Sequence, residues 1–172
     1  MGGKIGNALF FVLLALGLLL FAYRGQISTY FNASQEFTIR NMTFEDMLGY
    51  EATIQDGFRG YIVFYTDMKG CTACLSKIVH LKDVAKNFED IGFYAVVNEK
   101  SSRRPFGELM ATHEFPGDLM QDPDKHLTRR LGLTSHPMLL FFNRDGLMLA
   151  GLPLDVEHEA LVRQIYSYIE EM

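Results

Sequence analysis

The sequence predicts an α/β domain, a mixed β-sheet flanked by helices, preceded by one N-terminal transmembrane helix. Continuous apolar runs rich in β-branched and aromatic residues at 61–65, 91–98 and 138–142 are typical of buried strands. The stretches between them carry apolar residues at helical spacing. The segment 5–23 is apolar and uncharged. Strands that alternate with helices favour a mainly parallel sheet covered on both faces.

The composition excludes some classes of function. The chain has 172 residues and a net charge of -5, with no run of Lys and Arg that could follow a phosphate backbone. These features argue against a general nucleic-acid binder. The length fits one domain with a short appendage.

The N-terminal segment 5–23 has the length of a membrane span. At the rise of an α-helix it covers roughly 28 Å, close to the ~30 Å of a hydrocarbon core. Small residues suited to signal peptidase are poorly placed after it, which favours an uncleaved anchor over a signal peptide with an unusual cleavage site. Lys4 and the amino terminus precede the segment, so residues 1–4 are expected in the cytoplasm and the rest outside. Residues 24–36 are expected to form a polar tether to a domain at 37–172.

The first half of the domain is expected to begin with short strands and turns over 37–60. The buried strand 61–65 is followed by a short loop and then by a helix that continues to residue 88. The apolar positions of that helix recur at helical spacing: Leu75, Ile78, Leu81, Ala85 and Phe88. The strand 91–98 follows.

The second half alternates in the same way. We expect a helix that starts near Pro105, a short strand with a turn over 115–124, and a helix over 125–132 that Gly132 ends. The strand 138–142 turns at 143–146, where Asp-Gly is a hairpin signal, and 147–152 pairs back with it in antiparallel orientation. Asp155 is expected to cap a final helix, whose buried face would carry Leu161, Ile165, Ile169 and Met172.

The chain has two cysteines, Cys71 and Cys74, in the sequence GCTAC. Two thiols cannot build a dense disulfide framework, and a structural zinc site normally needs four ligands. The pair lies where a strand is expected to turn into a helix, and a helix N-terminus stabilises a thiolate. Cys71 is therefore the candidate nucleophile and Cys74 the resolving thiol of a redox pair. No cofactor is expected beyond the redox-active disulfide Cys71–Cys74.

A strand, a short loop, CxxC, a helix and a distant Pro137 that opens a strand resemble the thioredoxin pattern. More narrowly, 37–172 is similar to the membrane-anchored TlpA/ResA-like thiol-disulfide oxidoreductases of the redoxin group. The stretches that carry this resemblance are FTIRNMTFEDMLG, FRGYIVFY and DPDKHLTRRLGLTSHPMLLFFNRDG, and 101–122 matches the extra βα insert of that group.

The resemblance implies roles for residues outside the cysteine pair. Pro137 matches the family's cis-proline, and His136 would lie beside the cysteines and help to hold the substrate. One hypothesis is that a protonated His136 lowers the pKa of Cys71; the alternative is a backbone role alone. Asp67 is the nearest acid for proton transfer, unless it is only a solvated loop residue. Tyr65 stands where the family has a polar residue, and we expect it to pack in the core.

The chain also departs from the family. Gly70 replaces the usual Trp, and Ala73 replaces the Pro between the cysteines. These changes leave the redox potential and the direction open. The expected function is reduction or exchange of disulfides in extracytoplasmic proteins, with a membrane electron donor as a partner. The loop around Arg103 and Arg104 is expected to be solvated.

Three alternatives remain. A peroxiredoxin-like peroxidase would need Pro and Thr at fixed positions before the reactive cysteine, and counting back from Cys71 gives Phe64 and Met68 instead. A copper(I) metallochaperone would combine the two thiolates with an imidazole. A binding module would use the cysteines only structurally. The histidines show no metal-ligand spacing: His80, His113, His126, His136 and His158.

Overall fold

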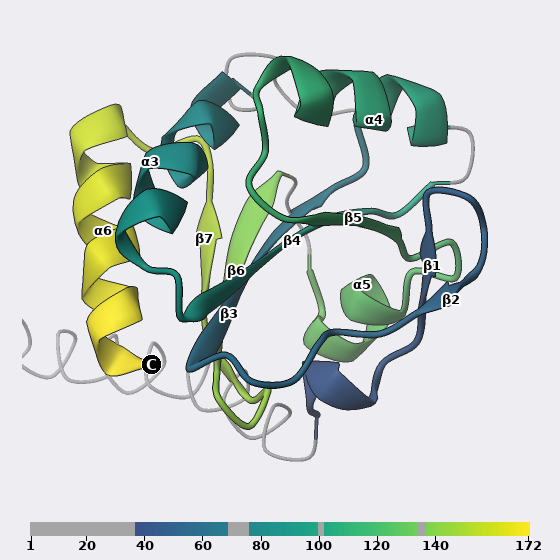
Figure 1. Ribbon diagram of the computed structural model, residues 1–172, viewed down its shortest axis with the longest axis horizontal. Helices are drawn as coiled ribbons and strands as arrows, with labels where there is room; N and C mark the ends of the chain where they lie inside the picture. Colours follow the sequence, from purple (N-terminus) through teal and green to yellow (C-terminus); the bar gives the residue numbers. More distant parts are fainter. Residues whose placement is uncertain (1–36, 69–75, 100–101, 134–136) are drawn as a thin grey trace, which may run out of the picture. The chain divides into compact units, whose positions relative to one another are not determined.

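The computed structural model describes residues 37–68, 76–99, 102–133 and 137–172, which belong to one folded unit over 37–172 (Figure 1). Strands and helices alternate along most of this unit. The elements are η1 (Ile39–Asn41), β1 (Phe44–Asp46), β2 (Glu51–Ala52), β3 (Gly60–Thr66), η2 (Ser76–Ile78), α3 (Val79–Asn87), β4 (Ile91–Val97), α4 (Arg103–Thr112), β5 (Asp118–Gln121), α5 (His126–Leu131), β6 (Met138–Asn143), β7 (Met148–Pro153) and α6 (His158–Glu171).

The seven strands form one mixed sheet in the order β2-β1-β5-β4-β3-β6-β7. β3 lies at its centre, parallel to β4 and antiparallel to β6. Only β3–β4 and β4–β5 are parallel pairs among the described strands, and the other neighbouring pairs are antiparallel. The expectation of a mainly parallel sheet is therefore wrong. A mixed sheet results because antiparallel pairs extend the parallel centre on both sides.

Both faces of the sheet are covered, as expected. Side chains of a strand alternate between faces, so Ile62 and Phe64 of β3 join one core while Tyr61, Val63 and Tyr65 join the other. The first core includes apolar residues of α3, α4 and α6, and the second includes residues of α5 and of the segment before β3. Figure 1 shows α3 and α6 side by side, with α5 apart from them. The sheet is thus buried on both sides, which explains its continuous apolar runs.

Most of the expected elements are confirmed. Gly132 ends α5 in the left-handed region, at φ 61°, where glycine is favoured. The turn between β6 and β7 is closed by the Asn143 side chain, whose Oδ1 accepts hydrogen bonds from the N–H groups of Asp145 and Leu147 at 3.0 and 2.9 Å. The predicted cap of the last helix is wrong. Asp155 lies in a turn, and α6 begins only after Glu157.

In the part of the chain that the structure describes, no helix is both long enough and apolar enough to cross a membrane. The predicted anchor at 5–23 and the tether at 24–36 lie outside the described residues.

Candidate functional site

The three parallel strands at the centre of the sheet end at one edge. β3, β4 and β5 run in the same direction and finish at Thr66, Val97 and Gln121. β6 runs the opposite way and starts at this edge, where Met138 pairs with Tyr65. The carboxyl edge of a sheet with parallel strands is where α/β proteins commonly place functional residues.

Cys71, Cys74 and His136 lie outside the described residues. The chain leaves β3 at Thr66, is described as far as Met68, and is described again from Ser76, at the start of η2. The cysteine pair therefore belongs, by sequence, to the connection between the central strand and α3. The predicted position of the pair at a helix N-terminus lies outside the described residues.

The exit from β3 is held by hydrogen bonds to Thr66. Its hydroxyl accepts the N–H of Met68 at 3.0 Å, and its carbonyl accepts the N–H of Asn98 at 3.1 Å. Met68 has a φ of 61°, which turns the chain sharply after the strand. Asp67 is partly exposed between them, at the same edge of the sheet. These contacts fix the path of the chain where it leaves β3.

The entry into α3 is fastened by Lys77. Its Nζ donates to the carbonyl of Leu154 at 2.9 Å and to that of Val156. Both carbonyls belong to the connection between β7 and α6. Ile78, which is buried, packs next to this anchor in the core shared with α3 and α6. The η2 segment, which precedes α3, is thus held to the connection between β7 and α6.

Pro137 is buried and directly precedes β6. Its carbonyl accepts the N–H of Leu154 at 3.2 Å. The next residue, Met138, is the β6 partner of Tyr65, so Pro137 lies at the edge where β3 ends. The fold therefore brings Pro137 and Asp67 to the same edge, although 70 positions separate them in the numbering.

A buried polar cluster, which sequence reasoning missed, joins Tyr65 to Asp122 and Thr128. The Tyr65 hydroxyl lies 2.7 Å from Thr128 Oγ1 and donates to Asp122 Oδ2 at 3.4 Å. Asp122 in turn accepts the N–H groups of His126 and Leu127 at 2.7 and 2.8 Å, at the start of α5. Burial is the main cause that raises the pKa of Tyr65 to about 12. Tyr65 is in the core, as expected, but its hydroxyl also serves this cluster.

Arg103 corrects the expectation of a solvated loop. It is the first residue of α4 and only partly exposed. Its Nε donates to Gln121 Oε1 at 2.8 Å, and its Nη2 lies 3.2 Å from Glu45 Oε2. Arg104, by contrast, is 90% exposed and pairs only with Glu108 in the same helix. The first arginine therefore ties α4 to the edge of β5, and the second faces solvent.

Polar side chains gather at the edge where the parallel strands end. Thr66, Asn98, Gln121 and Asp122 are all buried. Within the described ranges, Asn98 Oδ1 and Gln121 Nε2 have no hydrogen-bond partner. The signal was present in the sequence, because each of these residues ends or follows an apolar run. This edge retains unused hydrogen-bonding capacity in the interior.

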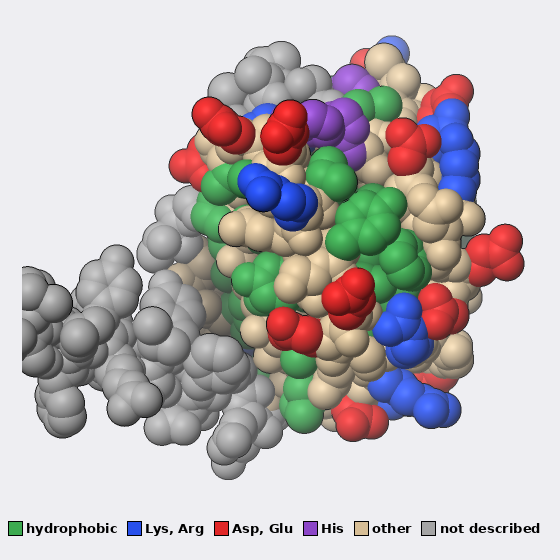
Figure 2. All heavy atoms as spheres, turned by 90° about the vertical axis from the view of Figure 1, so that its left-hand side faces the viewer, with side chains coloured by type: hydrophobic (Ala, Val, Ile, Leu, Met, Phe, Trp, Pro, Cys, Tyr) green, Lys and Arg blue, Asp and Glu red, His purple; other side chains and the backbone are tan. Residues whose placement is uncertain are grey.

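The described histidines do not form a metal centre. Residues 37–68, 76–99, 102–133 and 137–172 contain no group of three or more His, Cys, Asp and Glu side chains placed to hold a metal ion. Two imidazoles do meet, because the ring centroids of His80 and His158 are 4.0 Å apart. Figure 2 shows histidine side chains together on the side of the molecule that carries α3 and α6. Nearby His158 and the loss of solvation lower the pKa of His80, with desolvation the larger cause.

No protein-family model and no curated protein matches the sequence. Solved structures do match the fold. A secreted disulfide oxidoreductase of Mycobacterium tuberculosis, homologous to E. coli DsbE, has a TM-score of 0.59 and 13% identity over 73% of this chain and 95% of its own. The peroxidoxin BcpB of the same organism has a TM-score of 0.62 and 13% identity, with coverages of 79% and 96%. A thioredoxin-like protein from Porphyromonas gingivalis has a TM-score of 0.61 and 12% identity, with coverages of 78% and 95%.

The fold is thioredoxin-like. The predicted fold class is thereby confirmed for the domain, and the central β3, the helices on both faces and the β6–β7 hairpin are its parts in this chain. At such identities the likeness concerns the fold alone. The end of β3 and Pro137 lie at one edge of the sheet, and the cysteine pair follows β3 in the sequence, so this edge is the candidate functional site.

Proposed function

We propose that this chain is a membrane-anchored thiol-disulfide oxidoreductase that reduces or exchanges disulfides of extracytoplasmic proteins. One observation carries the proposal: the only CxxC of the chain lies between the central strand β3 and helix α3 of a thioredoxin-like fold. The solved structures of similar fold that are described as disulfide oxidoreductases support it. The substrates are protein disulfides, and the partner is a membrane electron donor.

The chemistry follows from two thiols and no added cofactor. The Cys71 thiolate attacks one sulfur of the substrate disulfide; that S–S bond breaks, a mixed disulfide forms, and the first substrate thiolate leaves. The Cys74 thiolate then attacks the Cys71 sulfur and releases the second substrate thiolate, which takes up a proton as the first one does. The substrate gains two electrons and the Cys71–Cys74 pair loses two. A dithiol on the electron donor returns them by the same exchange.

The direction of transfer is tested by the reduction potential of the full-length chain in a thiol-disulfide buffer. A value near or below roughly -250 mV agrees with a reductant, and a value above about -150 mV with an oxidant. The double variant Cys71→Ser, Cys74→Ser is the control. If it retains wild-type function, the cysteines are structural and the proposal is wrong.

His136 has a separate test. In the proposed site a protonated His136 lowers the pKa of Cys71 and makes the disulfide more oxidising. The pKa of Cys71, measured from the pH dependence of its alkylation, should rise in His136→Ala. An unchanged value leaves His136 a backbone role only. Asp67→Asn tests the proton-transfer role of Asp67. If Asp67 has that role, the variant should change the pH profile of disulfide reduction.

The location is tested with topology reporters. A protease-accessible tag after Met172 should be cleaved from the outer side of the membrane, and a tag before residue 5 should be protected. If the mature chain lacks residues 5–23, the segment is a cleaved signal peptide and not an anchor.

A peroxidase is the second candidate, because peroxiredoxin-type proteins match the fold as well as the disulfide oxidoreductases do. BcpB has a TM-score of 0.62, and a bacterioferritin comigratory protein of Xanthomonas campestris with alkyl peroxide reduction activity has 0.60 at 10% identity. In that reaction a cysteine thiolate would attack one peroxide oxygen and become a sulfenic acid, while the O–O bond breaks and the other oxygen leaves as water or an alcohol. The second thiol would then form the disulfide and release the sulfenic oxygen as water. Turnover of hydrogen peroxide by the full-length chain with dithiothreitol as the reductant decides between the two.

A further inference from the structure

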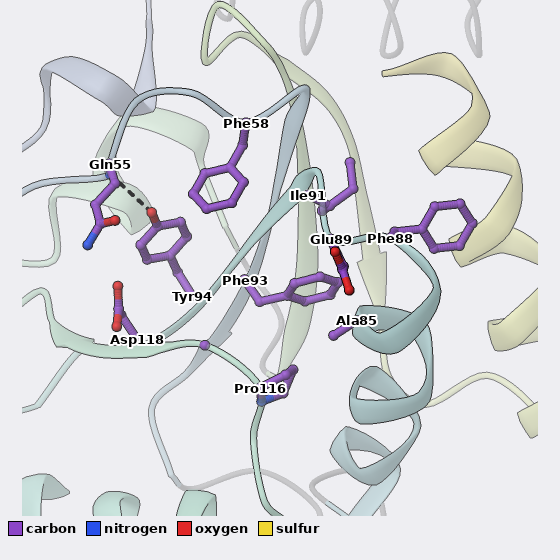
Figure 3. A pocket seen from close by; sticks show the side chains of 11 residues that line it. Gln55, Phe58, Ala85, Phe88, Glu89, Ile91, Phe93, Tyr94, Pro116 and Asp118 are labelled. Atoms are coloured by element: carbon purple, nitrogen blue, oxygen red, sulfur yellow. Dashed lines mark hydrogen bonds between the residues drawn. The ribbon is translucent and has the colours of Figure 1, made fainter.

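A second concave site lies at the opposite end of the sheet, where β4 and β5 begin (Figure 3). Its volume is about 350 Å³, within the range of small-molecule pockets. It exists because β5 is shorter than β4. β5 pairs with β4 only from Tyr94 onward, so Ile91 and Gly92 have no β5 partner on that side. The gap in the sheet edge opens between the end of α3 and the segment before β3.

The walls of this pocket are aromatic. Phe93 and Tyr94 are neighbours on β4 and project to opposite faces, so one ring lies on each side of the strand (Figure 3). Phe58 adds a third ring, packed edge-on against Tyr61 at a centroid distance of 6.2 Å. Gly92 makes this possible, since a Cβ there would lie 2.9 Å from the Phe58 ring and 3.1 Å from that of Tyr94.

The rim of the pocket is acidic. Glu89 and Asp118 line it from the α3 side and the β5 side, and both are exposed. Among the described residues neither carboxylate forms an ion pair. Two basic residues that follow pocket residues in the sequence are engaged elsewhere: Arg59, after Phe58, pairs with Asp90 at 2.7 Å, and Lys86, after Ala85, pairs with Asp83 at 3.2 Å. The two rim carboxylates thus leave a negative potential over the opening.

Two further features border the pocket, of which the first, a helix terminus, adds to that potential and the second is an unused hydrogen-bond donor. α3 ends at Asn87, so the negative end of its helix dipole adjoins the pocket residues Phe88 and Glu89. The Tyr94 hydroxyl accepts the N–H of Gln55 at 3.0 Å, and none of the described residues accepts its own proton. Tyr94 is only 1% exposed, so this donor is unused in a buried place.

We propose that this pocket binds an organic cation, an ammonium or guanidinium group attached to an apolar body. The apolar body packs on the rings of Phe93, Tyr94 and Phe58, and the charge lies between Glu89 and Asp118. Attraction between a cation and aromatic faces adds to the attraction of the carboxylates. The ligand is either a free amine or the Lys or Arg side chain of a partner polypeptide, since both carry this chemistry. The site is independent of the cysteine pair.

The test is a ligand series on the full-length chain labelled with 3-fluorotyrosine. The ¹⁹F signal of Tyr94 is assigned by its loss in Tyr94→Phe. Phenethylammonium should shift this signal in a saturable way, 2-phenylethanol should bind at least about threefold more weakly, and 3-phenylpropionate should not bind. A capped Gly-Arg-Gly peptide that binds at least as tightly as phenethylammonium indicates a polypeptide side chain, and weaker peptide binding indicates a free amine. Equal binding of the amine and the neutral alcohol, or no saturable shift with any cation, overturns the proposal.

Variants test the carboxylates separately. Glu89→Gln and Asp118→Asn should each weaken phenethylammonium binding about threefold, with 2-phenylethanol unchanged. Asp155→Asn removes an exposed acid outside the pocket and should change neither ligand. The loss of phenethylammonium binding in the two rim variants should be smaller in high salt, because salt screens exposed charges. If both rim variants bind phenethylammonium as the wild type does, the acidic rim has no role and the proposal is wrong. The ligand series uses only the wild-type chain and Tyr94→Phe for the assignment, so its result does not depend on whether the rim variants fold.

Discussion

The hydroxyl of Tyr65 lies 2.7 Å from Oγ1 of Thr128, across 63 positions of the chain. This contact joins the end of the central strand β3 to α5. α5 packs on the opposite side of the sheet from α3. Asp122 completes the link, because it accepts the Tyr65 hydroxyl and two N–H groups at the start of α5. A buried polar cluster therefore stabilises β3, the strand that precedes the cysteine pair in the sequence.

We expect Tyr65→Phe to lower the free energy of unfolding by about 1–2 kcal/mol. The ring still fills its place in the core, but Thr128 and Asp122 lose a buried hydrogen-bond partner. Urea unfolding followed by far-UV circular dichroism measures the change. Thr128→Val completes a double-mutant cycle, in which we expect a coupling energy of about 0.5–1.5 kcal/mol with Tyr65→Phe. Strictly additive effects would show that the contact contributes nothing.

We expect Asp122→Ala to be more costly, at about 2–3 kcal/mol. The substitution leaves the N–H groups of His126 and Leu127 without their acceptor and removes a hydrogen bond to a buried carboxylate. Asp124→Ala, two positions further on, is the matched control because its carboxylate is exposed. The same urea titration serves for both. Similar losses in the two variants would contradict the role of Asp122 at the start of α5.

Lys77→Met should loosen the start of α3. The methionine keeps most of the apolar stem, but the carbonyls of Leu154 and Val156 lose their donor. We expect a loss of about 1 kcal/mol and faster amide hydrogen exchange in the connection between β7 and α6. Lys86→Met is the control, since Lys86 makes only an exposed pair with Asp83. Unchanged exchange in that connection would rule out the anchor.

The sequence was sufficient for the parts of the fold that repeat a simple pattern. β3, β4 and β6 are continuous apolar runs because both faces of the sheet are buried, and α6 has a clear apolar face. β1 and β2 have three and two residues, too few for any periodicity, so the antiparallel pairing of β1 with β2 and with β5 could not be foreseen. The prediction of the α6 cap failed because Asp155 lies in a turn that the pattern does not reveal.

Only the parts of the site that depend on local sequence could be predicted. The spacing of Cys71 and Cys74 and the match of Pro137 are local signals, and the fold brings Pro137 to the edge where β3 ends. The Tyr65–Asp122 contact spans 57 positions and depends on how two strands and a helix pack. The pairing of His80 with His158 depends in the same way on the packing of α3 against α6. No spacing rule in the sequence reports such contacts.

The stability of the domain should depend on pH through His80. Its pKa is lowered from 6.5, first by desolvation, then by the nearby His158 and by Lys77, and Asp83 opposes the shift. The unfolded chain therefore binds more protons than the folded one below about pH 6.5, so stability is full above that pH and falls as the pH drops toward the folded pKa. We expect the free energy of unfolding to fall less between pH 7.5 and 5.0 in His80→Gln than in the wild type. Urea unfolding at each pH measures it. His113→Gln, outside the pair, should keep the wild-type dependence.

Two glycines should respond differently to alanine. A Cβ on Gly117 would lie 1.8 Å from the backbone carbonyl oxygen of Phe93, and backbone atoms of a paired strand cannot move aside. Gly132 has open space around it but a φ of 61°, so an added Cβ there meets only conformational strain.

We expect Gly132→Ala to cost about 1 kcal/mol and Gly117→Ala several times more, because the start of β5 must separate from β4. Thermal unfolding of the two variants, compared with the wild type, measures the order. Since Gly117 also lines the acidic pocket, Gly117→Ala should reduce phenethylammonium binding, whereas Gly132→Ala should leave it unchanged. A Gly117→Ala variant as stable as Gly132→Ala would mean that β5 does not approach β4 as closely as the register of Tyr94 with Asp118 requires.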